Sequence, residues 1–427
     1  MSVTGDGDTD TVEHAVADAH RREWAFVLAA TARVAGDLDL AEECVQDAYV
    51  AALDTWARDG VPRKPGAWLT AAAKRKALDA LRRNRVFRTK LPLLVEPDEV
   101  DMDEPDDDAV PDDRLRLIFT CCHPALNREA QVALTLRLVC GVSTGDISRL
   151  FLVTEPTMAA RITRAKKKIS AARIPYRVPG ADELPDRLDA VLTVVHLFYT
   201  TGHTAPSGGD LIRADLVEHA LNLARILLTL MPDEPEVRGL LALLILTDAR
   251  RSTRTDAQGR LVLLEDQDRS AWDRAAIDEG CHLTADAFRS GRVGRYALQA
   301  AIASLHAVAA DYAATDWPQV LRLYDELLKV WPSPVVALNR AVAVSMVSGP
   351  PAALDEIDAL ERDGRLGGYH YLPAVRADLL RRLGRWSEAA AAYRAALDLA
   401  DNAAEREFLA NRLAEAVESG SGRPSER

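Results

Sequence analysis

The amino-acid sequence predicts an all-α protein in which two small helical domains, joined by an acidic linker, precede a long helical repeat domain. Three observations predict this fold. Apolar residues recur at helical spacing, residues 141–169 have the pattern of two helices joined by a tight turn, and a period close to 34 residues recurs near the C-terminus. The expected segments are a first domain over 11–86, a linker over 87–113, a second domain over 114–172 and a C-terminal domain over 184–418.

The first domain begins with an amphipathic segment that contains Val12, Val16 and Trp24. A second helix, LAEECVQDAYVAALDTW, is expected to open at Asp39. Its spacing places Glu42, Glu43 and Asp47 on the exposed face. The opposite side is predicted to pack inward through Leu40, Cys44, Val45, Ala48, Ala52 and Leu53.

A turn rich in proline and glycine, residues 59–66, separates this helix from a third one over 68–85. Trp68, Leu69, Ala72, Leu78 and Leu81 are expected to face inward. The outward residues belong to a basic block over 58–90 that contains only two acidic residues. A solvated face would explain these charges, but doubled arginines after Leu78 fit a helix that follows phosphates better.

Residues 96–113 contain eleven acidic residues, three prolines and no basic residue, so we expect a linker that does not pack. Such a tether could also mimic nucleic acid in a positively charged channel of a partner. On composition alone, the spacer interpretation is favoured over mimicry.

The second domain ends in residues 141–169, which predict a helix-turn-helix. Asp146, Ile147, Leu150 and Phe151 give the first helix, and residues 152–154 give the turn. Thr154 is the expected N-cap of the second helix, with Pro156 in its first turn, and Asn127 is expected to cap an earlier helix. Met158, Ile162, Ala165 and Ile169 should pack inward. The exposed residues of this helix are then expected to be Thr157, Arg161, Arg164, Lys166, Lys167 and Lys168.

The charge distribution suggests two contacts with one polyanion. The chain has a formal net charge of -12, which argues against a general nucleic-acid coat. Residues 161–177 nevertheless form a second basic block without any acid, well separated from the first. We therefore expect two nucleic-acid-binding segments within an acidic chain.

Five cysteines without paired spacing argue against a disulfide framework. Cys121, Cys122 and His123 could supply metal ligands, but adjacent cysteines on a helix point apart and no second ligand pair follows, so a buried helix end before Pro124 is favoured. The acidic N-terminus and the lack of a long apolar run predict neither a signal peptide nor a membrane segment. A cytoplasmic protein without a cofactor is expected.

Over residues 11–172, the order and spacing of these features resemble the bacterial sigma-70 family, specifically its extracytoplasmic-function factors. The resemblance implies that the helix LAEECVQDAYVAALDTW binds core RNA polymerase through Glu43, Gln46 and Asp47. The segment PRKPGAWLTAAAKRKALDALRR is similar to the part that melts and captures the -10 promoter element. The acidic stretch takes the place of the linker that threads the RNA exit channel.

The DNA-binding residues that this resemblance implies fall into two groups. For the -10 element they are Arg63, Lys64, Trp68, Lys74, Arg75, Lys76, Arg82 and Arg83. For the -35 element they are Thr157, Arg161, Arg164, Lys167 and Lys168. Trp68 can stack on an unpaired base, although a role as a core anchor is slightly favoured. Ala159 and Ala160 stand where relatives often have basic or amide side chains, which leaves fewer donors for base edges.

The C-terminal half aligns with itself at Trp317, Pro351 and Trp386, close to the tetratricopeptide period of about 34 residues. Gly384, Trp386, Ala389, Tyr393 and Ala396 occupy positions similar to that family's packing residues, and Pro232 and Pro332 are expected to terminate helices. A loop over 250–268 interrupts the period. The whole chain resembles the sigma-factor subgroup with a C-terminal tetratricopeptide-like domain, although the segment YTTGHTAP departs from that subgroup's acidic version.

The leading interpretation is an RNA polymerase sigma factor that binds core polymerase and promoter DNA. Its C-terminal domain is expected to regulate initiation by contacting a protein partner or another part of the chain. The alternative is a helix-turn-helix regulator with a tetratricopeptide sensor, and a third possibility is a scaffold. An enzyme is not expected, because Asp266, Asp268, Arg269 and Trp272, or His306 with Asp311, form no set of nucleophile, base and orienting group.

Overall fold

The computed structural model describes residues 6–90, 113–151, 153–204 and 211–421. Within these residues the regular structure is helical, and an isolated antiparallel bridge joins Thr255 to Leu261. The predicted all-α fold is therefore confirmed. The chain divides into two compact units, Met1–Val194 and Val195–Arg427.

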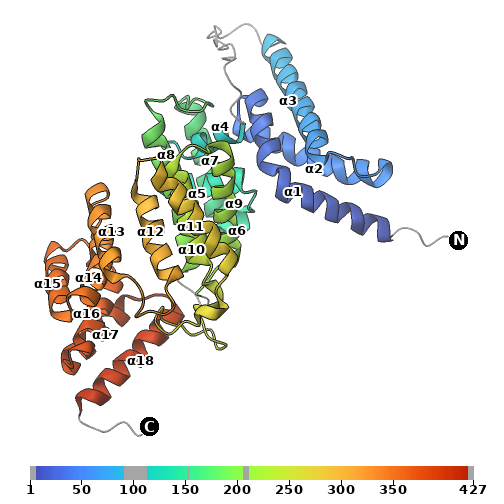
Figure 1. Cartoon of the computed structure of the whole chain (residues 1–427). Coiled ribbons are helices and arrows are strands. Elements are labelled where there is room, and N and C mark those ends of the chain that lie inside the picture. The colour runs from blue at the N-terminus through green and yellow to red at the C-terminus, as the bar shows by residue number, and fades with distance from the viewer. Residues whose placement is uncertain (1–5, 91–112, 152, 205–210, 422–427) are drawn as a thin grey trace. The chain divides into compact units, whose positions relative to one another are not determined.

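The first unit begins with three long helices that pack against one another, α1 (Asp6–Ala35), α2 (Leu38–Asp59) and α3 (Pro65–Lys90) (Figure 1). The N-cap of α2 is Asp37, whose Oδ1 accepts a hydrogen bond from the Leu40 amide at 2.9 Å. The expectation that Asp39 opens this helix was therefore wrong by two residues: Asp39 lies in the first turn. Gly60, at φ +84°, ends the helix in a conformation that residues with a Cβ rarely adopt.

Two apolar residues that were expected to face inward are exposed. Leu53 on α2 is 40% exposed and Leu78 on α3 is 45% exposed. The buried stripe of α2 contains Ala48 and Ala52 as predicted, and that of α3 contains Ala73 and Ala77 in place of Ala72 and Leu78. Small side chains allow these helices to approach closely, so the larger leucines at the margin of each stripe stay in solvent.

The second part of the first unit consists of short helices. Their bounds are α4 (Asp113–Cys121), α5 (Arg128–Leu134), the π-helix η1 (Thr135–Val139), α6 (Thr144–Leu150) and α7 (Glu155–Ala171). Asn127 caps α5 as predicted, because its Oδ1 accepts from the Ala130 amide at 2.8 Å. Of the predicted linker, residues 91–112 lie outside the described residues; residues 87–90 belong to α3 and Asp113 begins α4.

Helix α8 (Leu184–His203) begins in the first unit and ends in the second. The remaining helices are α9 (Ala214–Leu230), α10 (Pro235–Asp248), α11 (Arg274–Arg289), α12 (Arg295–Val308), α13 (Trp317–Val330), α14 (Pro334–Val347), α15 (Pro350–Asp363), α16 (Tyr371–Arg382), α17 (Trp386–Leu399) and α18 (Ala403–Gly420). Two short 3-10 helices, η2 (Arg251–Thr253) and η3 (Arg269–Ala271), lie in the loop between α10 and α11. Pro232 and Pro332 follow the ends of α9 and α13 as predicted.

Helices α10 and α12 approach each other unusually closely at Gly239. A Cβ on this glycine would lie 2.5 Å from the amide nitrogen of Ala297, so a side chain does not fit here. One turn earlier, the carboxylate of Glu236 accepts hydrogen bonds from the amides of Tyr296 and Ala297 at 2.9 and 3.1 Å. Glu236 therefore satisfies the N-terminal amides of α12, and the glycine allows the helix backbone to come within reach of it.

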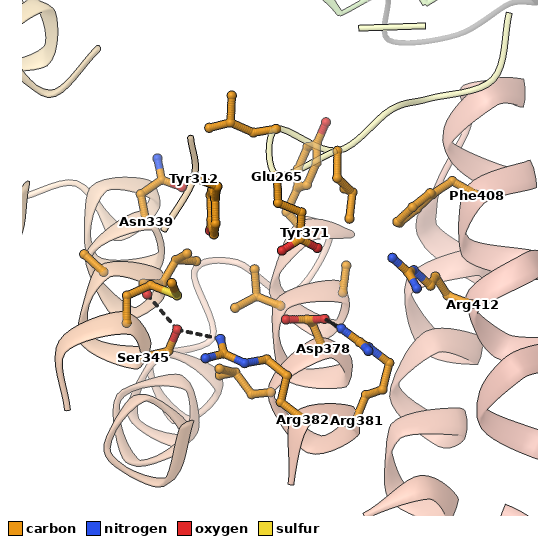
Figure 2. Close-up of a pocket in the computed structure, with 18 of the residues that line it drawn as sticks. Glu265, Tyr312, Asn339, Ser345, Tyr371, Asp378, Arg381, Arg382, Phe408 and Arg412 are labelled. Atoms are coloured by element: carbon orange, nitrogen blue, oxygen red, sulfur yellow. Dashed lines mark hydrogen bonds and ion pairs between the residues drawn. The ribbon is translucent and has the colours of Figure 1, made fainter. Parts of the chain in front are cut away.

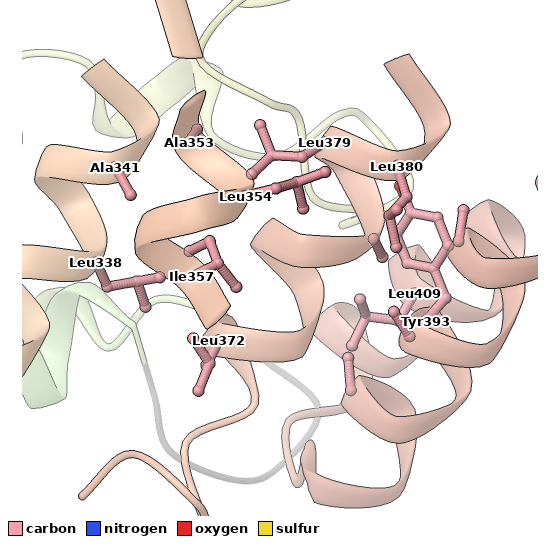
Figure 3. Packing of buried hydrophobic residues seen from close by; sticks show 14 of the residues in the cluster. Leu338, Ala341, Ala353, Leu354, Ile357, Leu372, Leu379, Leu380, Tyr393 and Leu409 are labelled. Carbon is pink, nitrogen blue, oxygen red and sulfur yellow. The ribbon is translucent and has the colours of Figure 1, made fainter. Parts of the chain in front are cut away.

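From α13 to α18 each helix packs on the one before it (Figure 1). Figure 3 shows the shared core, in which Leu338, Ile357, Leu380 and Leu409 come from four different helices. Tyr393 and Ala396, two of the predicted packing positions, are buried in this cluster. The N-terminal residues of α13, α15 and α17 are Trp317, Pro350 and Trp386, so the sequence period corresponds to a pair of helices.

The loop that was predicted to interrupt the repeats is held in place by polar contacts within the second unit. Arg254 Nη2 donates to Thr204 Oγ1 at 2.9 Å, and Trp272 Nε1 donates to Thr253 Oγ1 at 2.9 Å. The guanidinium of Arg269 lies 4.6 Å from the centroid of the Trp272 ring. Among the residues that the structure describes, no helix is both long and apolar enough to cross a membrane.

Candidate nucleic-acid interface

Helix α2 has one buried face and one polar face in solvent. Ala41, Val45, Ala48 and Ala52 have no exposed surface. Helical spacing then places the three predicted polymerase-binding residues in solvent, and all of them are exposed: Glu43, Gln46 and Asp47. Asp47 is joined to α3 by Lys76, whose Nζ lies 3.4 Å from Asp47 Oδ2.

Apolar side chains border this polar face. Val50 is 61% exposed and Leu53 is 40% exposed, and both are on α2. An isolated exposed leucine is ordinary, but two large apolar residues next to exposed acids give α2 the mixed character of a protein-binding surface. Helical spacing had placed Leu53 in the core, so this apolar border could not be predicted from the sequence.

The basic side chains of α3 and its preceding loop are accessible to a ligand. Five of the predicted -10 residues are exposed: Arg63, Lys64, Arg75, Arg82 and Arg83. Lys74 and Lys76 are half-buried. Most of these cations are in one helix and its entry loop, so α3 can follow a phosphate backbone.

Trp68 is half-buried and packs edge-on against Trp56, with ring centroids 5.7 Å apart. Trp56 itself is 1% exposed. This contact anchors the start of α3 on α2, which fits the interpretation of Trp68 as a core residue. Part of its ring remains accessible beside Arg63 and Lys64.

Helices α6 and α7 form the predicted helix-turn-helix. Ile147 of α6 and Met158 of α7 have no exposed surface, and Ile162, Ala165 and Ile169 continue the buried stripe of α7. Thr154 is at the N-cap of α7, but its hydroxyl pairs with Thr157 Oγ1 at 2.8 Å and makes no capping hydrogen bond. Leu152, in the predicted turn, lies outside the described residues.

The predicted -35 residues are on the outer side of α7. Thr157, Arg164, Lys167 and Lys168 are exposed. Arg161 is half-buried, and its Nη1 lies 3.0 Å from Glu129 Oε2 of α5. Arg164 Nε donates to the Ala160 carbonyl at 3.2 Å, so its charge has no acidic partner within the part of the chain that the structure describes. Arg164 is consequently better placed than Arg161 to bind an anion.

Lys166 was expected in solvent, but its side chain is only 8% exposed. Its Nζ lies 2.5 Å from Glu42 Oε2 and 2.8 Å from Asp39 Oδ1, both on α2. Glu42, also expected in solvent, is 7% exposed and is shared with Arg137, whose Nη2 lies 2.5 Å from Glu42 Oε1. Burial lowers the pKa of Lys166, but the two carboxylates outweigh it, so the net shift is upward and the side chain stays charged.

The sequence spacing contained a signal for this ion cluster. Lys166 lies four residues after Ile162 and three before Ile169, within the apolar stripe of α7. Glu42 has the same relation to Leu38 and Val45 on α2. A charged residue in register with a buried stripe requires a partner, and a lysine and a glutamate in that position on two helices could have been paired.

Two further hydrogen bonds join α1 to the helix-turn-helix part of the first unit. Trp24 Nε1 donates to the Leu138 carbonyl at 3.1 Å, and Tyr176 Oη donates to the Ala29 carbonyl at 2.9 Å. Together with the Lys166 cluster, these contacts hold α7 against α2 in the free chain. The exposed basic residues of α7 and the exposed acids of α2 remain in solvent in this arrangement.

The cysteines of the segment that was considered for a metal are buried. Cys121 is fully buried, and burial raises the pKa of its thiol well above the ordinary value. Burial also raises the pKa of Cys122 to about 11, while its Sγ lies 3.5 Å from Thr135 Oγ1. Thiols with raised pKa values stay protonated and are poor metal ligands.

The fold and the exposed residues together define a class of protein. One helical domain presents acids and apolar residues on α2 and cations on α3, and a second presents a basic recognition helix in a helix-turn-helix. A DNA-binding protein with two separate basic helices and a distinct acidic face matches a transcription initiation factor.

Comparison with known proteins identifies the family. Residues 15–86 match the model of sigma-70 region 2, and residues 116–169 match that of sigma-70 region 4. The chain belongs to the sigma-70 family and is an RNA polymerase sigma factor. Members of this family are transcription initiation factors that bind core RNA polymerase and promoter DNA.

The C-terminal half has a separate set of similarities. Residues 187–288 match a family of unknown function, DUF6596. A protein of Rhizobium meliloti (strain 1021), described as uncharacterized, is 45% identical over 383 residues, which cover 88% of this chain and 90% of the relative. The similarity therefore extends over most of both chains. No solved structure matches the chain.

Proposed function

We propose that the chain is an extracytoplasmic-function sigma factor that acts in the cytoplasm. In this proposal α2 binds core polymerase through Glu43, Gln46 and Asp47, and the loop before α3 with α3 itself captures the -10 element. Helix α7 contacts the -35 element. The main support is that cationic surfaces on α3 and α7 lie in the two segments that match sigma-70 regions 2 and 4.

The polymerase-binding role of α2 is supported by its exposed acids and the neighbouring apolar residues Val50 and Leu53. Such a mixed face binds a protein through an apolar centre and a charged rim. DNA binding by the basic helix α3 does not explain why the adjacent helix α2 has exposed acidic residues. A simple helix-turn-helix regulator has no use for this face.

Recognition of the -35 element would depend on few side chains. Ala159 and Ala160 are exposed at the start of α7 and have no hydrogen-bonding side chains. Thr157, Thr163 and Arg164 are then exposed side chains of the first turns that can donate to base edges, and Lys167 and Lys168 would bind phosphates. This division predicts a promoter that is specified by few -35 bases.

We also infer that the C-terminal unit is a tetratricopeptide-like interaction domain that regulates initiation. Helices α13 to α18 form consecutive pairs whose starts recur with the sequence period. A stack of helix pairs presents a concave surface suited to ligands or partners. The 45% identical relative is matched over 90% of its length, which supports the view that the C-terminal unit belongs to the same protein as the DNA-binding helices.

Run-off transcription with purified core polymerase and the full chain tests the sigma function. We expect initiation on genomic fragments that contain its promoters, and none with core polymerase alone. Asp47→Ala should weaken binding to core polymerase about tenfold, since it removes a charge from the rim of the proposed interface. Asp47 and Lys76 form an exposed ion pair, so its loss should lower the free energy of unfolding by less than about 1 kcal/mol.

Glu13→Ala, which removes one acidic charge from an exposed position on α1, is the matched control and should leave core affinity unchanged. Equal affinities for the Asp47 variant and the parent would remove α2 from the interface. Failure of the parent chain to initiate on every fragment, despite binding of DNA, would favour a simple DNA-binding regulator.

A further inference from the structure

The second unit contains a cavity of about 590 Å³ that has no role in the proposed promoter contacts. Most of its lining comes from α14, α16 and α18, which are alternate helices of the paired array, and from the loop segment 261–265 (Figure 2). Helices α12, α13 and α17 contribute further residues. The loop crosses the open side of the array, so the space is bounded by helices and by the chain's own backbone. Pockets of this size hold small organic molecules.

Much of the cavity surface is apolar. Val342 and Met346 of α14, Val375 of α16, and Phe408 and Leu409 of α18 line it. These residues are half-buried or buried, and they surround the space from three helices. An apolar lining of this extent favours a ligand with an aliphatic or aromatic body.

Two of the acidic groups that line the cavity are already paired. Arg381 Nη2 lies 2.7 Å from Asp378 Oδ1. Glu405 accepts a hydrogen bond from the Tyr371 hydroxyl and lies 3.4 Å from His370 Nε2. The charge of Asp378 is therefore balanced by Arg381, whereas Glu405 is hydrogen-bonded by Tyr371 and keeps its negative charge.

Arg382 differs from these residues. Its Nη1 donates to Ser345 Oγ at 3.0 Å, and within the described residues it has no carboxylate partner (Figure 2). A guanidinium has five N–H donors, so most of its donors remain available. Next to an apolar cavity, an arginine that pairs only with a neutral hydroxyl is a suitable site for a carboxylate.

Two neutral hydrogen-bonding groups complete the polar part. Tyr312 keeps its proton, because burial and then Glu265 raise its pKa to about 12. His306 also lines the cavity, and its Nδ1 is buried without a hydrogen-bond partner in the described structure. Burial lowers the pKa of His306 to about 4, so the imidazole is neutral at pH 7 and could accept or donate one hydrogen bond.

We propose that this cavity is a binding site for a small organic acid. Its carboxylate pairs with Arg382 beside Ser345, and its apolar body lies against Met346, Val375 and Phe408. Charge and lining both favour this class. Arg382 is exposed and has no carboxylate partner within the described residues, so it is available to an anion, and the apolar lining disfavours a fully hydrated one such as phosphate. Because the loop segment 261–265 already borders the space, a small molecule fits it better than an extended peptide.

A binding titration of the full chain with anilinonaphthalene sulfonate, a fluorescent aromatic anion, tests this site. We expect one saturable site per chain. Arg382→Met should weaken binding about tenfold, which corresponds to the loss of one charge-assisted contact. Arg385→Met is the matched control: Arg385 does not line the cavity and pairs with Glu388 at 2.6 Å, so affinity should stay within about twofold of the parent.

Competition separates charge from hydrophobicity. Octanoate should displace the probe, whereas octylammonium, with the same apolar chain and the opposite charge, should not. Ala374→Phe, which adds an aromatic ring to a cavity-lining position, should abolish binding even in a chain whose melting temperature and circular dichroism match the parent.

Absence of saturable probe binding, or equal binding by the parent, the Arg382 variant and the Ala374 variant, would overturn the proposal. Displacement by octylammonium as readily as by octanoate would also overturn it, since the site would then not select anions. These measurements require neither polymerase nor promoter, so their outcome is independent of the transcription assay.

Discussion

Arg164 and Arg161 are one turn apart on α7, but their surroundings differ. Arg161 is neutralised by Glu129 at 3.0 Å, whereas Arg164 is exposed and contacts only the Ala160 carbonyl of its own helix. An arginine with a carboxylate partner must give up that contact to bind DNA. Arg164 meets a phosphate or a base edge without this cost.

Arg164→Ala should therefore weaken holoenzyme binding to its promoter by about 1–3 kcal/mol and reduce protection of the -35 region in a footprint. Arg289→Ala removes an exposed arginine of α11 that is paired with Asp286 and lies outside the DNA-binding segments, and it should leave the footprint unchanged. Full -35 protection with the Arg164 variant would exclude this residue from the contact.

At the scale of helices, the principal finding is that α7 packs on α2 through a buried ion cluster. Lys166 contacts Glu42 and Asp39, and Arg137 contacts the other oxygen of Glu42. Buried charges of this kind contribute little net stability as a set, but the loss of one member leaves the others unpaired. The same helix that presents the proposed polymerase face therefore also holds the recognition helix.

Lys166→Met should destabilise the packing of α7 on α2 by about 3 kcal/mol, because Asp39 and part of Glu42 lose their partner. Amide hydrogen exchange within α7 should then be about a hundredfold faster. Lys167→Met changes the adjacent, exposed residue and should have an effect below about 0.5 kcal/mol. Identical exchange in the two variants would show that the cluster does not hold α7.

At the scale of the whole chain, the two units differ in their buried titratable groups. The second unit contains three histidines with lowered pKa values. Burial and nearby arginines lower the pKa of His196 and His306 to about 4, and they also hold the pKa of His203 well below its ordinary value. Each of these histidines stays neutral in the folded chain at pH values at which it is protonated in the unfolded chain. The unfolded state therefore binds more protons below about pH 6.5.

Stability of the second unit should be complete above pH 6.5 and fall as the pH decreases toward 4. For each of His196 and His306 the loss at pH 5 should be about 2 kcal/mol. Thermal melts at pH 7, 6 and 5 should show this decrease. In His306→Gln the decrease should be smaller, and in His282→Gln, which changes an exposed histidine, it should match the parent. A melting temperature that is constant between pH 7 and 5 would contradict the prediction.

The sequence by itself determined the helical fold, the helix-turn-helix, the Asn127 cap and the repeat period of the C-terminal helices, because each depends on local spacing or on residues within one turn. The tertiary structure decided which residues at the edges of the apolar helix stripes are buried. Leu53 and Leu78 are exposed, whereas Glu42 and Lys166 are buried. Lys166 lies 124 residues after Glu42 in the chain, so their pairing depends on how α7 packs on α2. The cavity beside Arg382 is likewise formed by several helices and a loop, and only their packing brings them together.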